Sequence, residues 1–230
     1  MAKRFITLLL IALLAYMFLP FIVEVDETSQ LNRVAEKYVT AGPLELGAAN
    51  LVTAVIVTYR GLDTLGEIVV LFIAAVGIGF LLRKPSKKKI AAPKRSSSEI
   101  LRTGSDFLIP LLILFGVYIF THGHLTPGGG FQGGVVLTSA ALLFMLSNTE
   151  ARFNKQLTEV IESVSGIFYL IIGILGLILA GGFLDSRFLQ LGEMGRLFSA
   201  GAIPIIYSII GIKVGMELIG ILEKLRKEEI

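Results

Sequence analysis

Long apolar runs alternate with short polar segments along the chain, and the runs carry almost no charge. A bilayer core of about 30 Å is crossed by a helix of about 20 apolar residues. The runs are continuous, whereas the strands of a membrane barrel would alternate apolar and polar positions. The pattern therefore predicts an all-α, polytopic membrane protein with about seven transmembrane helices. The predicted helices cover Phe5–Val23, Leu46–Tyr59, Leu65–Leu82, Phe107–Thr121, Gly133–Leu146, Val160–Leu184 and Leu197–Leu222.

Composition supports a membrane protein and narrows its chemistry. Of the 230 residues, 54% are hydrophobic and 17% are charged, and the mean hydropathy is +0.78. The chain has no cysteine, which excludes disulfides, thiolate metal sites and iron–sulfur clusters held by this chain. The first run is followed by "EVDETSQ", which offers no small-residue cleavage site. We therefore expect a retained membrane anchor rather than a secretory signal peptide.

A basic segment divides the chain. The stretch "RKPSKKKIAAPKRSSSEILRTGS" contains two prolines, five serines and eight Lys or Arg against Glu99 alone. Such a segment predicts a self-repelling tether between two membrane parts. We expect a three-helix membrane segment over residues 1–83, a linker over 84–104 and a four-helix membrane segment over 105–230. The basic residues of this linker account for the basic pI of the chain, so nucleic acid is not an expected partner.

The Lys/Arg distribution predicts the orientation in the membrane. With the linker in the cytoplasm, seven spans place fifteen Lys or Arg inside and five outside, as the positive-inside rule favours. We therefore expect the N-terminus outside and the C-terminus in the cytoplasm. Three of the predicted spans have only 14 or 15 residues, about 21 to 23 Å of helix, and should recruit polar neighbours such as His122 to membrane depth.

The stretch "THGHLTPGGGFQGG" carries the two histidines of the chain and six of its glycines. It satisfies the G-x-G-x-x-G pattern of dinucleotide sites, but apolar helices stand on both sides where a strand should come first. His122 and His124 would point to different faces of a helix, and no carboxylate lies nearby to complete a metal site. We expect a helix end and a tight turn. A second interpretation is that His122 is a proton-accessible group at the end of a helix.

Two pairs of charged residues fall in or beside the predicted spans. Asp63 and Glu67 lie four residues apart on one helix face, and Glu67 stands inside the apolar run. A buried carboxylate there would suit a site that binds a proton or transiently a sodium ion, whereas Asp63 also suits the start of a helix. Lys213 and Glu217 are four apart on the last helix, where they can pair with each other or act on another helix. A lysine that reaches the membrane interface is the alternative.

Two further features concern the last part of the chain. Gly211 and Gly215 form a small-x3-small face that predicts close helix packing. The stretch "LDSRFLQLGEMGR", from Leu184 to Arg196, mixes acidic and basic residues in a connection. We expect its charges to be solvated.

Several of these stretches together resemble a known family. "RVAEKYV…NLVTAVIVTYRGLDTLGEIVVLFIAAVGI" resembles the C-terminal membrane segment of the A subunit of Mrp-type multisubunit sodium/proton antiporters, and the equivalent small subunit of archaeal membrane-bound hydrogenases. "FTHGHLTPGGGFQGGVVLTSAALL" and "SAGAIPIIYSIIGIKVGMEL" resemble their B subunit. The first resemblance covers roughly residues 1 to 83 and the second roughly 103 to 222. Thr58 stands in "VTYRG" where an acidic residue is common in the family.

The resemblance implies a membrane subunit of a sodium/proton antiporter module, within a respiratory complex such as a membrane-bound hydrogenase or the related sulfane sulfur reductase. It implies that Glu67 lies on the cation path, that other membrane subunits, Na⁺ and H⁺ are the partners, and that the chain is not itself an enzyme. We expect no cofactor and no resident metal in the chain. The alternatives are a scaffold subunit that moves no ion, and a membrane enzyme with a metal on the two histidines.

Overall fold

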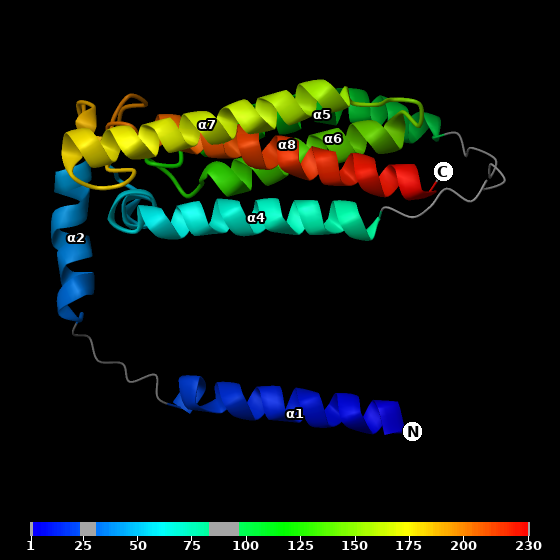
Figure 1. Ribbon diagram of the computed structural model, residues 1–230, viewed down its shortest axis with the longest axis horizontal. Coiled ribbons are helices and arrows are strands. Elements are labelled where there is room, and N and C mark those ends of the chain that lie inside the picture. Colours follow the sequence, from blue (N-terminus) through cyan, green and yellow to red (C-terminus); the bar gives the residue numbers. More distant parts are fainter. Residues whose placement is uncertain (1, 24–30, 83–96, 230) are drawn as a thin grey trace. The chain divides into compact units, whose positions relative to one another are not determined.

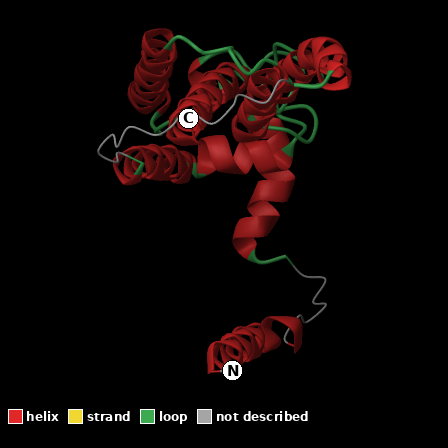
Figure 2. Cartoon of the chain, turned by 90° about the vertical axis from the view of Figure 1, so that its right-hand side faces the viewer, coloured by secondary structure: helices red, strands yellow, loops and turns green. Residues whose placement is uncertain are grey.

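The computed structural model describes residues 2–23, 31–82 and 97–229, and these residues form helices and loops without a strand (Figure 2). The prediction of an all-helical protein is confirmed. The chain divides into two compact units, residues 1–37 and residues 38–230. The first unit contains α1 (Ala2–Val23), which confirms a helix over the first apolar run, and the start of α2 (Arg33–Leu46).

The second predicted span, Leu46–Tyr59, is wrong as a straight helix. The chain there ends α2 at Leu46, begins α3 (Leu51–Ala54) and continues as a π-helix, η1 (Val55–Tyr59). The bend between α2 and this second piece is 88°. Gly47 takes a left-handed conformation with φ of +62°, which suits a residue without a side chain after a helix. The Oδ1 of Asn50 then accepts hydrogen bonds from the backbone N–H groups of Val52 and Thr53 and starts the new helix.

Five long helices form the bundle of the second unit (Figure 1). The helix α8 contacts each of the other four, so it is the centre of the bundle. These five helices are long and apolar enough to cross a membrane, and the bent α2–η1 pair is a possible sixth span. The protein is therefore a multi-pass membrane protein, although the predicted count of seven spans is not confirmed. The five helices are α4 (Gly61–Leu81), α5 (Glu99–Thr121), α6 (Gly130–Ser147), α7 (Lys155–Ala180) and α8 (Ile203–Glu229).

The predicted short span Phe107–Thr121 gains its length on the linker side. The helix α5 begins at Glu99, after Ser98 accepts a hydrogen bond from the backbone N–H of Leu101 at 3.2 Å. Its 23 residues suffice to cross a bilayer, so His122 is not needed to complete the span. The last residues of the expected linker, 99–104, are thus helical. Residues 83–96 of that linker lie outside the described residues.

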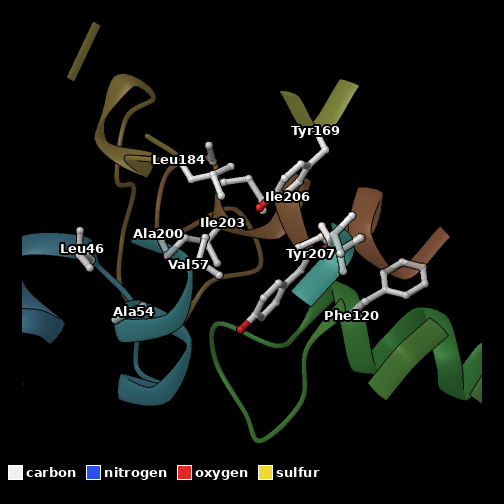
Figure 3. Close-up of a cluster of buried hydrophobic side chains, with 14 of the residues drawn as sticks. Leu46, Ala54, Val57, Phe120, Tyr169, Leu184, Ala200, Ile203, Ile206 and Tyr207 are labelled. Carbon is white, nitrogen blue, oxygen red and sulfur yellow. The ribbon is translucent and has the colours of Figure 1, made fainter. Parts of the chain in front are cut away.

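The two ends of the bundle differ. At the linker end, α4 ends and α5 and α7 begin. At the opposite end, which we call the loop end, the connections 122–129 and 181–202 close over the bent α2–η1 pair. Figure 3 shows the buried apolar side chains of the loop end, where Val57 lies beside Ile203. A short 3-10 helix, η2 (Ser186–Phe188), belongs to this end.

Glycines bring α5, α6 and α8 into close contact. A Cβ on Gly133 would lie 2.7 Å from the carbonyl oxygen of Gly116, and one on Gly134 would lie 2.8 Å from that of Gly211. The hydroxyl of Thr138 donates a hydrogen bond of 3.3 Å to the carbonyl of Gly215 across the same contact. The predicted close packing at Gly211 and Gly215 is confirmed, and the glycine-rich stretch serves it.

Replacing Gly134 by alanine is expected to destabilise the bundle by about 1–3 kcal/mol, because the added methyl group must push α6 away from α8. The clash would involve backbone and the Cβ of Val214, at 2.9 Å, neither of which can turn aside. Thermal unfolding of the purified complex measures the effect. Gly104→Ala on α5 is the matched control, since nothing lies within 4 Å of its position and alanine favours a helix. An unfolding temperature of Gly134→Ala at or above that of the control would contradict the packing.

Candidate ion-translocation site

A lysine lies between two carboxylates in the middle of a membrane span. Lys213 is near the centre of the span Ile203–Arg226 of α8 and is 7% exposed. Its Nζ donates a hydrogen bond of 2.8 Å to Oε2 of Glu217, one helical turn later. The same Nζ is 3.8 Å from Oε1 of Glu162, which belongs to α7. The expected pairing of Lys213 with Glu217 is confirmed, and a second helix joins it.

The three charged groups differ in their access to water. Glu217 is 2% exposed, whereas the side chain of Glu162 is 22% exposed. The ring of Phe72 on α4 lies over Lys213, with Nζ 5.9 Å from the ring centroid, a distance that suits a cation–π contact. Oε1 of Glu217 is buried and has no hydrogen-bond partner among the described residues. A buried, unpaired carboxylate oxygen is costly, so the cluster favours a function over simple packing.

Glu67 does not have the burial that the sequence suggests. It lies in α4, about 9 Å along the helix axis from Gly61, and is exposed on the surface of the chain. The helix turns Thr64, Ile68 and Ala75 toward its neighbours, and Glu67 stands beside that stripe. It is close enough to act electrostatically on the hydroxyl of Tyr169. The prediction of a carboxylate at membrane depth stays a prediction, and the prediction that the chain itself buries Glu67 is wrong.

Asp63 has a different environment from Glu67. It forms an ion pair of 2.5 Å with Arg60, and the two side chains are 51% and 62% exposed. Such an exposed pair stabilises a protein by about 1 kcal/mol or less. The pair lies at the first turn of α4, where a carboxylate is favourable to the helix dipole. The geometry therefore favours the helix-start interpretation of Asp63.

The two histidines lie at the loop end and apart from Lys213. His122 ends α5 and stacks on Tyr118, with ring centroids 4.4 Å apart. His124 is fully buried, and burial lowers its pKa below the usual value, which favours the neutral ring. Its Nε2 is 3.4 Å from the carbonyl oxygen of Arg196, which can only accept a hydrogen bond, so the proton belongs on Nε2. Among the residues that the structure describes, no group of three His, Asp or Glu side chains could hold a metal.

The loop between α5 and α6 is held to the bent segment. The side-chain amide of Asn50 donates hydrogen bonds to the carbonyls of Gly123 and Thr126, at 2.8 and 3.0 Å. Thr53 donates another to Gly123, at 2.6 Å. The expectation of a helix end and a tight turn for this stretch is confirmed. The role proposed for His122 as a proton-accessible group stays a prediction.

Sequence reasoning missed two features of the polar groups. Glu162 was not expected near Lys213, although a carboxylate two residues inside the predicted span Val160–Leu184 was a signal for it. The expectation that Asp185 is solvated is wrong, since the residue is 4% exposed. Asp185 accepts hydrogen bonds from the guanidinium and the backbone N–H of Arg187. The side-chain bond, with the charge of the carboxylate, raises the pKa of Arg187. Asp185 thereby caps the start of the 3-10 helix η2 at the loop end.

Comparisons with known proteins agree with this architecture. Residues 100–220 match the family described as a domain related to the MnhB subunit of Na⁺/H⁺ antiporter, and residues 3–97 match the MbhE family of MBH. A chain in the structure of the membrane-bound sulfane sulfur reductase, an archaeal respiratory membrane complex, is 43% identical, with 98% of each chain covered and a TM-score of 0.84. A chain of the Mrp complex from Dietzia sp. DQ12-45-1b shares the fold, with a TM-score of 0.77 at 20% identity, over 97% of this chain and 26% of that one.

The relatives found by sequence match a smaller share of this chain than the solved structures do. An uncharacterised protein of Methanocaldococcus jannaschii is 28% identical over 189 residues, with 72% of each chain covered. The putative antiporter subunit mnhB2 of Staphylococcus aureus is 39% identical over 70 residues, which are 30% of this chain and 45% of that protein. The family match over residues 100–220 covers more than half of the chain, and its glycine-packed helices and Lys213 lie within it. The chain thus belongs to the MnhB-related family of Na⁺/H⁺ antiporter subunits, joined in one polypeptide to a part that matches the MbhE family.

Proposed function

We propose that the chain moves cations within the antiporter module of a respiratory membrane complex, and that Lys213 is the centre of this activity. The observation that carries the proposal is that one buried ammonium group, in the middle of a membrane span, is shared by two carboxylates. The family and the similarity to a chain of the sulfane sulfur reductase complex support the setting. Na⁺ and H⁺ are the proposed ions.

The proposed mechanism follows from the two distances. Lys213 contacts Glu217 at 2.8 Å and is 3.8 Å from Glu162, so it fully neutralises one carboxylate at a time. The carboxylate that it leaves must bind a proton or a sodium ion, because an isolated charge within a membrane span is costly. Movement of Lys213 between the two partners would therefore couple binding at one to release at the other. Glu67 is the proposed second carboxylate on the path, and His122 the proposed proton-accessible group at the loop end.

A scaffold subunit that moves no ion is the alternative function. In a scaffold, Lys213 and Glu217 would form a dry pair that serves only packing. A cavity of about 400 Å³ lies against Glu217 and Glu162, and this favours transport because water has room beside the pair. The proposed partners are other membrane subunits of the complex. We also propose that cofactors and redox chemistry belong to those subunits, and that the linker end faces the cytoplasm.

Glu217→Gln tests the function. Glutamine keeps the size of the side chain and removes its charge, so Lys213 stays with Glu162 and the exchange stops. We expect sodium-dependent proton transport by the assembled complex in membrane vesicles to fall about tenfold or more, the effect of 1.4 kcal/mol on a rate-limiting barrier. Glu193→Gln is the matched control, because Glu193 forms an exposed pair with Arg196 in a loop. Wild-type transport by Glu217→Gln in an assembled complex would contradict the proposal.

A further inference from the structure

A partly open cavity lies between α4, α7 and α8 at the linker end. Its volume is about 400 Å³, enough for several water molecules. Four carboxylates line it, Glu159 and Glu162 from α7 and Glu217 and Glu223 from α8, together with two ammonium groups, those of Lys155 and Lys224. The wall on α4 is formed by Phe72, Ala75 and Val76. Figure 1 shows α4, α7 and α8 running side by side toward this end.

Along each of the two helices the deeper carboxylate is the more buried one, Glu162 on α7 and Glu217 on α8. Glu159, at the outer end, forms an exposed ion pair of 3.4 Å with Lys155. Glu223 accepts a hydrogen bond from the backbone N–H of Phe153 and is 3.6 Å from Arg226. Glu162 lies about 10 Å deeper than Lys155 along the axis of α7, at 1.5 Å per residue. Glu217 is the most buried of the four. The polar wall therefore leads from the surface into the membrane span.

Two carboxylates share one ammonium group at the inner end of the cavity. The outer carboxylates each have a cationic partner, whereas Glu162 and Glu217 share Lys213. Lys224 of α8 is a further ammonium group on the wall of the cavity. Glu217 lines this end, and its Oε1 is buried and has no hydrogen-bond partner among the described residues. The shared ammonium group and the unpaired oxygen call for a positively charged ligand at Oε1.

The cavity stops being polar beyond Lys213. A second cavity, of about 290 Å³, continues between α4 and α7 and shares Phe72, Glu162 and Ser163 with the first. Its other walls are mostly apolar and include Leu65, Ile68 and Ile167. Beyond Lys213 and Glu162, which also line it, this space offers water few hydrogen-bond partners. Water that enters from the linker end is therefore expected to reach Lys213 and Phe72 and to go no farther.

We infer that the first cavity is a water-filled vestibule, open at the linker end, which brings a hydrated monovalent cation to Oε1 of Glu217. The inference rests on the proposed function, because it supplies the ion that replaces Lys213 at one carboxylate. The outer carboxylates attract the cation, and Phe72 with the apolar cavity behind it ends the aqueous path. The vestibule is thus the half of the route on the linker side.

Cysteine accessibility tests the vestibule, and the chain has no cysteine of its own. Ser163→Cys and Ala75→Cys place thiols on two walls of the vestibule, and Ile167→Cys, one turn deeper on α7, is the matched control in the apolar cavity. Vesicles that contain the whole complex are treated on both faces with membrane-impermeant methanethiosulfonates, one cationic and one anionic. Modification of this chain is followed by mass, and rates are corrected for the reactivity of each reagent with a free thiol.

We expect both vestibule thiols to react, and about tenfold faster with the cationic reagent, because four carboxylates stand against two ammonium groups on its walls and an excess of one sign of charge concentrates counter-ions. Glu217→Gln added to Ser163→Cys should lower that ratio, and Ile167→Cys should stay unmodified. Unreactive thiols at 163 and 75 would overturn the vestibule, and equal rates for the two reagents would overturn its preference for cations. Labelling does not require turnover. A reactive vestibule with wild-type transport by Glu217→Gln would therefore refute the proposed function and leave the vestibule standing.

Discussion

Replacing Lys213 by methionine is expected to destabilise the chain by about 3–5 kcal/mol, the cost of removing one partner from a buried ion pair. Methionine fills similar space and keeps contact with Phe72, so the loss is electrostatic. Glu217 would stay 2% exposed inside a membrane span with no cation at contact distance. A lower temperature of thermal unfolding of the purified complex, and less of this chain retained in it, would be the measured results.

Removing the carboxylate instead of the lysine should destabilise the chain less. In Glu217→Leu the ammonium group of Lys213 keeps Glu162, which is 3.8 Å away and closer to water. The double variant Lys213→Met, Glu217→Leu removes the whole pair and should recover most of the lost stability, since well-packed apolar residues often replace buried pairs without loss. A double variant as unstable as Lys213→Met would show that the instability does not come from the unpaired carboxylate.

The double variant also separates transport from scaffolding. A scaffold needs only a well-packed helix at positions 213 and 217, so a stable double variant would then keep the complex at full activity. A transporting subunit would keep its assembly and lose sodium-linked proton transport. Stability and transport are therefore measured on the same double variant. A scaffold and a transporting subunit predict opposite results for its transport.

Helix positions could be predicted from the sequence where one strong pattern determines them. The apolar runs place the ends of α4 and α6 to within four residues, those of α7 to within five and those of α8 to within seven, because a membrane span leaves few alternatives. The pairing of Lys213 with Glu217 follows from four-residue spacing on one helix. The glycine contacts of α6 with α8 follow from the small-x3-small pattern.

Features that depend on several elements could not be predicted. The bend after Leu46 depends on Gly47 and on Asn50, whose side chain bonds to a loop more than 70 residues later. The nearness of Glu162 to Lys213 depends on how α7 packs on α8, which periodicity does not determine. The burial of Asp185 needs the fold of the whole loop end. In each case a tertiary contact overrides what the local pattern indicates.

The exposure of Glu67 changes the kind of site to which it belongs. A carboxylate on the outer surface of a membrane helix meets either lipid or another protein, and lipid contact is costly. We therefore propose that another subunit covers Glu67, so that its site is shared between two chains. Tyr169, whose hydroxyl is buried without a hydrogen-bond partner among the described residues, lines the second cavity beside Lys213.

Glu67→Gln is expected to abolish sodium-linked proton transport and to leave the complex assembled, because glutamine keeps the shape of the contact and removes the charge that binds the cation. Asp63→Asn, four residues earlier on α4, is the matched control. Asp63 forms an exposed pair with Arg60 at the start of the helix, so its loss should leave transport near the wild-type rate. Transport and subunit content are measured on the same vesicles. Full transport by Glu67→Gln would remove this residue from the path, and the Lys213 cluster with its vestibule would then be the only ion site that we propose in the described part of the chain.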